Sequence, residues 1–80
     1  MSGETFTLGE LAQRVTSGSL RAIARMLNDA GANPRLDENE PDRSAVVARQ
    51  TVIDLAAARA GDRVGRVLGR LLSETMPTEE

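Results

Sequence analysis

The ten residues RVGRVLGRLL at positions 63–72 decide the fold class, because their apolar side chains recur with the period of an α-helix. Five of these side chains occupy relative positions 0, 3, 4, 7 and 8 and therefore share one stripe. They are Val64, Val67, Leu68, Leu71 and Leu72. With Asp62 as its N-cap, this spacing predicts a helix over residues 63–73.

Three further segments follow the same helical period. They are residues 7–15, residues 20–30, which stop at Gly31, and residues 44–60, which stop at Gly61. The segment 44–60 carries two adjacent apolar stripes. We therefore expect it to be packed by more than one neighbour, in the middle of the bundle.

The start of the first helix has a clear capping signal. Thr7 is followed three residues later by Glu10, which is the spacing of a capping box. Phe6, the single aromatic residue of the chain, precedes the cap and is expected to pack onto Leu11 as a hydrophobic staple.

No stretch alternates apolar and polar residues for long enough to predict a strand. We therefore expect an all-α fold, a compact bundle of four to five short helices. At 80 residues and 8.6 kDa the chain has room for one small domain over residues 1–80. Its core should span about residues 5–74, with a frayed tail at residues 75–80.

The residue types that are missing bear directly on function: the chain has no Cys, His, Lys, Trp or Tyr. Without Cys and His there is no thiolate nucleophile, no imidazole base and no zinc site of nitrogen and sulfur ligands. Without Lys there is no Schiff base and no phosphate-binding P-loop lysine. We expect a protein that is not an enzyme and that holds neither a cofactor nor a metal.

Four carboxylates lie close together in the polar stretch before the third predicted helix. They are Asp37, Glu38, Glu40 and Asp42. Asp37 and Asn39 match the first two ligand positions of an EF-hand loop, but Pro41 stands where a third ligand belongs, so a calcium site is not predicted. The stretch is either a solvated loop or an acidic contact patch for an arginine-bearing partner.

The basic residues, all arginines, are concentrated toward the end of the chain. Arg59, Arg63, Arg66 and Arg70 are expected to form a ridge along the last helix. Two glycines, at positions 65 and 69, lie on the same helix at a cost of up to about 1 kcal/mol each. Such small residues permit close approach either of a neighbouring helix or of a partner chain.

This charge polarity leads to our first functional hypothesis, a non-catalytic adaptor or protein–protein interaction domain. The acidic loop and the arginine ridge would each meet a complementary face of another copy or of a related helical domain. Contacts of this head-to-tail kind would build a homo-oligomer.

A second hypothesis is a small DNA-binding regulator. Leu8–Ala12, a Ser/Gly turn and Leu20–Ile23 look like the opening of a helix-turn-helix or winged-helix module, with Arg21 and Arg25 as groove contacts. Nucleic acid is nevertheless the less favoured partner, because the net charge is −2 and no basic arm supplies phosphate contacts. A third hypothesis is a phage or mobile-element inhibitor that blocks a host complex through the acidic face.

Over residues 7–77 the chain resembles the small bacterial effector-associated, or death-like, domains. The resemblance lies in the helix lengths, the glycine turn after the second helix, the junction ARAGDR at residues 58–63 and the terminal Met76-Pro77. It implies docking between like domains in bacterial conflict or antiviral defence systems, with no chemistry of its own.

The sequence also gives an expectation for the compartment. The amino terminus has no basic region followed by an apolar run, so no secretory signal is predicted. No apolar stretch approaches the ~20 residues that span a bilayer. We expect a cytoplasmic protein that makes no contact with a membrane.

Overall fold

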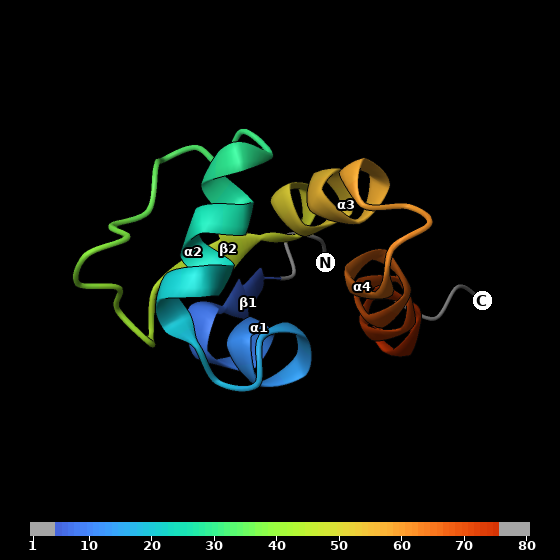
Figure 1. Cartoon of the computed structure of the whole chain (residues 1–80), viewed down its shortest axis with the longest axis horizontal. Coiled ribbons are helices and arrows are strands. Elements are labelled where there is room, and N and C mark those ends of the chain that lie inside the picture. The colour runs from blue at the N-terminus through green and yellow to red at the C-terminus, as the bar shows by residue number, and fades with distance from the viewer. Residues whose placement is uncertain (1–4, 76–80) are drawn as a thin grey trace.

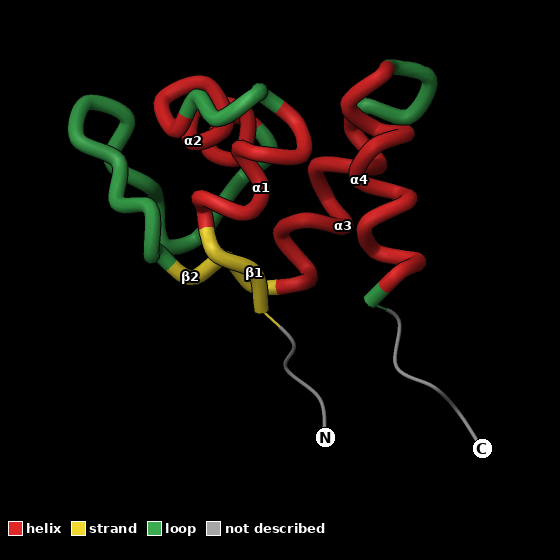
Figure 2. Tube along the Cα trace, turned by 90° about the horizontal axis from the view of Figure 1, so that it is seen from below, coloured by secondary structure: helices red, strands yellow, loops and turns green. Residues whose placement is uncertain are grey.

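The computed structural model describes residues 5–75 of the chain. Six elements follow one another along it: β1 (Thr5–Thr7), α1 (Leu8–Val15), α2 (Leu20–Asp29), β2 (Val46–Ala48), α3 (Arg49–Ala58) and α4 (Arg63–Glu74). Helices α3 and α4 pack against each other beside the part formed by α1, α2 and the strands (Figure 1). The long connection between α2 and β2 extends on the side away from α3 and α4 (Figures 1 and 2).

The prediction of an all-α fold is wrong, because the described chain also contains a small antiparallel sheet. Thr5–Thr7 pairs with Val46–Ala48, with Phe6 opposite Val47. Each strand buries its middle residue and exposes the two that flank it, as expected for a sheet with one covered face. Threonine, phenylalanine and valine favour extended backbone, so the residue types agree with the observed pairing.

The third helix is shorter than predicted because residues 46–48 form strand β2 instead. It begins at Arg49 rather than at residue 44 and ends at Ala58. Only one of its two apolar stripes is buried, through Val52 and Leu55. On the other stripe Ile53 is 39% exposed. More than one neighbour packs against this helix, as predicted, since α3 contacts α4, α2 and β2. The prediction that it lies in the middle of the molecule is wrong, because its second stripe is exposed.

Helix α1 takes the central place instead. All four apolar residues of its stripe are buried. They are Leu8, Leu11, Ala12 and Val15. Because α1 contacts α2, α4 and β1, it joins the two halves of the molecule.

The boundaries of α1, α2 and α4 agree with prediction to within one residue at each end. Thr7 caps α1, since its Oγ1 accepts a hydrogen bond of 3.2 Å from the Glu10 backbone N–H. Asp62 caps α4, since its Oδ1 accepts one of 2.7 Å from the Arg63 backbone N–H. Gly61, after α3, has a φ of +95°, a left-handed conformation that favours glycine over other residues.

The two glycines of α4 have different surroundings. A side chain on Gly65 would overlap the backbone carbonyl group of Arg59, so the glycine lets α4 approach the end of α3 closely. Gly69 has nothing within 4 Å of the position its Cβ would take. Close packing inside the domain therefore explains Gly65 and leaves Gly69 without a packing role.

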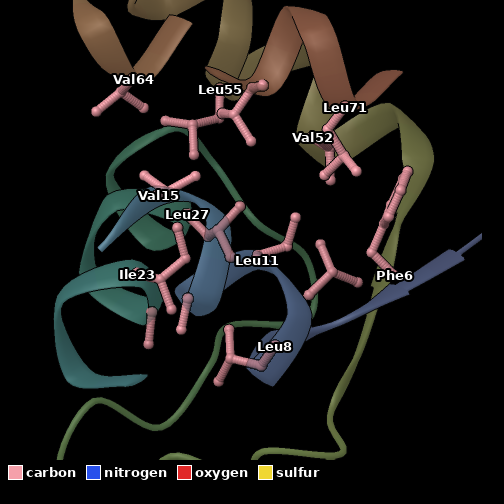
Figure 3. Packing of buried hydrophobic residues seen from close by; sticks show 14 residues of the cluster. Phe6, Leu8, Leu11, Val15, Ile23, Leu27, Val52, Leu55, Val64 and Leu71 are labelled. Atoms are coloured by element: carbon pink, nitrogen blue, oxygen red, sulfur yellow. The ribbon is translucent and has the colours of Figure 1, made fainter. Parts of the chain in front are cut away.

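One apolar core is shared by all six elements (Figure 3). Phe6 brings β1 into the part of this core where Val52 and Leu71 also lie, so its role is packing, from within a strand. The buried side chains are mostly leucine and valine, in keeping with a small domain with a thin core.

Residues 76–80, most of the tail that the sequence predicts to be frayed, lie outside the described residues, and so does Met76-Pro77. Among residues 5–75, no helix combines the length and the apolar character needed to cross a bilayer.

Candidate functional site

Three arginines from two helices surround an open depression of about 410 Å³ between α2 and the end of α3. Arg21 and Arg25 lie one turn apart on the exposed side of α2, and Arg59 is the C-cap residue of α3. Met26 contributes apolar surface to the same depression. We call Arg21, Arg25 and Arg59 the α2 cluster.

Arg59 is held in place by the turn that joins α3 to α4. Its Nη1 donates a hydrogen bond of 3.1 Å to Oδ2 of Asp62, and the two form an ion pair. This bond, together with the backbone N–H of Arg63, keeps the pKa of the Asp62 carboxyl below its usual range. Arg21 and Arg25 differ from Arg59, because within residues 5–75 their side chains have no ion-pair or hydrogen-bond partner.

Arg63 connects this cluster to the end of α1. It is the first residue of α4, and its Nη1 donates a hydrogen bond of 3.2 Å to the backbone carbonyl of Val15. A cation at the carboxyl end of a helix interacts favourably with the partial negative charge there. The contact also shows that the amino end of α4 lies beside the carboxyl end of α1.

A second group of arginines lies farther along α4. Arg14, Arg66 and Arg70 surround an open depression of about 320 Å³ together with Val67. Arg14 comes from the last turn of α1 and forms an ion pair of 3.0 Å with Glu74. We call Arg14, Arg66 and Arg70 the α4 cluster.

The two clusters and Arg63 place seven arginines around the α1–α2 turn, the α3–α4 turn and α4. Three carboxylates accompany them: Asp29, Asp62 and Glu74. We call these seven arginines the basic face. The α3–α4 turn lies at the opposite end of the molecule from the two strands (Figure 2). Although the chain has a net charge of −2, these seven arginines outnumber the three carboxylates beside them.

Most carboxylates of the acidic loop hold the loop together. Oδ1 of Asp37 accepts hydrogen bonds from the backbone N–H groups of Asn39 and Glu40, at 2.9 and 3.0 Å. Oε2 of Glu38 accepts one of 2.9 Å from Nδ2 of Asn28 and pairs with Arg35. These carboxylates are therefore local structural groups.

Asp42 and Glu40 complete the loop. Asp42 accepts hydrogen bonds from the backbone N–H and the hydroxyl of Ser44, and these bonds lower the pKa of its carboxyl. Within residues 5–75, Glu40 is the one carboxylate of the four whose side chain makes no hydrogen bond or ion pair. The loop and the helices α3 and α4 lie on opposite sides of α2 (Figure 1), so the loop lies away from the arginines of α4.

The structure groups the predicted site residues differently from the sequence analysis. It joins Arg59 of the expected ridge to Arg21 and Arg25, which belonged to a separate hypothesis. It adds Arg14, which no sequence pattern marks as a site residue. Because Arg14 lies off the apolar stripe of α1, the sequence predicts only that it is exposed. Its place beside α4 depends on tertiary packing.

Within residues 5–75, no three acidic side chains gather in a way that could hold a metal ion. No family model, curated protein or solved structure matches the chain.

Proposed function

We propose that this domain binds duplex DNA through helix α2, as a helix-turn-helix module. The observation that carries the proposal is the unpaired, exposed pair Arg21 and Arg25 on the second of two helices joined by a short turn. In helix-turn-helix proteins the second helix enters the major groove, and residues near its amino end contact the base edges. Arginine is the commonest residue in such contacts because its planar fork pairs with guanine.

The local structure around the turn supports this role. Residues 16–19 connect α1 and α2, and the Oγ1 of Thr16 donates a hydrogen bond of 2.8 Å to the Ser19 carbonyl. Ser19 caps α2 by accepting a hydrogen bond from the Ala22 backbone N–H. The turn therefore fixes the amino end of α2, where Arg21 lies, relative to α1.

The surrounding charge also supports DNA as the ligand. Arg59 and Arg63 lie beside α2 and α1 in the fold, and a phosphate backbone crossing these helices would meet them. Three of the four acidic-loop carboxylates already accept hydrogen bonds from the loop or from α2, which leaves fewer of them for a protein partner. The proposal includes a cytoplasmic location for the protein.

The test measures binding of short fluorescein-labelled duplexes by anisotropy over a range of salt concentrations. We expect a dissociation constant on the order of 10⁻⁴–10⁻⁶ M for unselected sequences, with an affinity that falls steeply as salt rises. Arg21→Gln and Arg25→Gln should each weaken binding and relax the preference among duplex sequences, because each removes a contact to a base edge. Arg35→Gln is the matched control, because Arg35 is an exposed arginine of the acidic loop. Absence of binding by the natural protein at low salt would contradict the proposal.

Docking to another protein remains a second candidate, favoured by the separation of the acidic loop from helices α3 and α4 (Figure 1). It includes the adaptor role that the resemblance to death-like domains implies, and inhibition of a host complex. Sedimentation velocity at low and high salt distinguishes self-docking from DNA binding. Self-association that is lost with Glu40→Lys, without any binding of duplexes, would favour docking.

A further inference from the structure

We propose that the α4 cluster is a second contact surface that holds the sugar-phosphate backbone of the same duplex. This inference rests on the proposed function. It assigns to Arg14, Arg66 and Arg70 a role different from that of α2, namely binding of phosphates without reading of bases.

The first support is the arrangement of Arg66 and Arg70. They lie four residues apart on the exposed side of α4, where like charges repel each other. Within residues 5–75 neither side chain has a hydrogen-bond or ion-pair partner. A bound phosphate would relieve this repulsion, and guanidinium groups bind phosphate through two parallel hydrogen bonds.

The second support is the exposed ion pair that Arg14 forms. Its ion pair with Glu74 is exposed, with 42% of the Arg14 side chain and 47% of the Glu74 side chain accessible to solvent. Exposed pairs of this kind are weak, so a phosphate can displace the carboxylate. Glu74 therefore acts as an internal competitor for the same arginine.

The third support concerns the kind of anion. The cluster is open and draws its cations from two helices, and Arg63 continues it toward the α2 cluster. Such a row of exposed cations suits a ligand with repeated charges better than a single small anion, which proteins usually hold with converging backbone N–H groups. The backbone of a duplex has this repeated charge.

The test compares three variants with the natural protein: Arg66→Gln/Arg70→Gln, Arg21→Gln/Arg25→Gln and Glu74→Gln. We expect R66Q/R70Q to weaken binding equally for every duplex sequence and to reduce the salt slope by about two. The α2 variant should also change the order of preference among sequences. Glu74→Gln should raise the affinity by up to about fivefold. Glu40→Gln is its control, with the same change in charge on the acidic loop, and should have a smaller effect. Circular dichroism checks that each variant is folded.

The outcomes separate this inference from the proposed function. If R66Q/R70Q binds like the natural protein while R21Q/R25Q is weakened, the α4 cluster has no such role and α2 keeps its own. If the natural protein binds no duplex, both are wrong. A last experiment compares DNA binding in inorganic phosphate with DNA binding in chloride at equal ionic strength. Displacement of DNA by phosphate alone would indicate a small-anion site and overturn the assignment to the duplex backbone.

Discussion

Asn28 is the one buried polar residue among residues 5–75, and its amide group fastens the acidic loop to α2. Its Oδ1 accepts a hydrogen bond from the Leu36 backbone N–H, and its Nδ2 donates to the Leu36 carbonyl, both at 2.8 Å. The same Nδ2 donates to Glu38 at 2.9 Å. All the polar groups of this amide are therefore satisfied, as burial requires.

Replacement of Asn28 by alanine should destabilise the protein by roughly 1–3 kcal/mol, because both backbone groups of Leu36 lose their partner. Urea denaturation measures the change, and hydrogen exchange should show faster exchange at the Leu36 amide. Asp29→Ala, at an exposed neighbouring position, is the control and should change stability by less than about 0.5 kcal/mol. Equal effects of the two substitutions would show that the amide does not hold the loop.

The two glycines of α4 give a matched pair of substitutions. Gly69→Ala should stabilise the protein by up to about 1 kcal/mol, because alanine favours a helix and the site is open. Gly65→Ala should instead destabilise it by about 1–2 kcal/mol, since the new methyl group meets the Arg59 carbonyl, which is part of the backbone. Thermal unfolding measures both changes. A stabilising Gly65→Ala would mean that α3 and α4 are not in close contact there.

At the scale of elements, the amino end of α4 depends on a charged cap. The pKa of Asp62 is lowered by the hydrogen bond from Arg59 and by the backbone N–H of Arg63. A carboxyl with a lowered pKa in the folded state contributes stability at neutral pH and loses it as the pH falls through that pKa. The stabilisation should therefore be complete above about pH 4, the usual pKa of an aspartate, and disappear as the pH falls through the lowered pKa of Asp62.

Asp62→Asn tests this dependence, because asparagine is also a good N-cap but carries no charge. The melting temperature of the natural protein should exceed that of the variant at neutral pH, and the gap should close as the solution is acidified. Asp54→Asn on α3 is a comparison variant, because Asp54 accepts a hydrogen bond from Gln50 within the helix and caps no helix. A gap between the natural protein and Asp62→Asn that is independent of pH would contradict the role of the charge.

Helices could be predicted from the sequence and strands could not, for a physical reason. A helical stripe repeats over two or more turns, as in α4, whereas three residues are too few to reveal a period of two. Residues 46–48 also fit the apolar spacing of the following helix, and only pairing with residues 5–7 makes them a strand. That partner is far away in the sequence, so local patterning does not identify it.

At the scale of the whole molecule, the sequence predicts the charge polarity but not the neighbours of each arginine. The acidic middle and the basic end of the chain follow from composition alone. The meeting of Arg59 with Arg21, and of Arg14 with Arg70, depends on how α1 and α2 pack against α3 and α4. The candidate site therefore forms only through tertiary packing, although most of its residues could be predicted individually from the sequence.

The close approach at Gly65 has a mechanical consequence for whatever the basic face binds. Because α4 rests directly on the backbone at the end of α3, no side chain separates the two helices at Gly65. The backbone positions of Arg59 and Arg63, on either side of the α3–α4 turn, are therefore held at one separation. A ligand whose curvature does not match that separation must itself bend, so stiffness of the bound molecule, as well as its charge, would govern how tightly it is held.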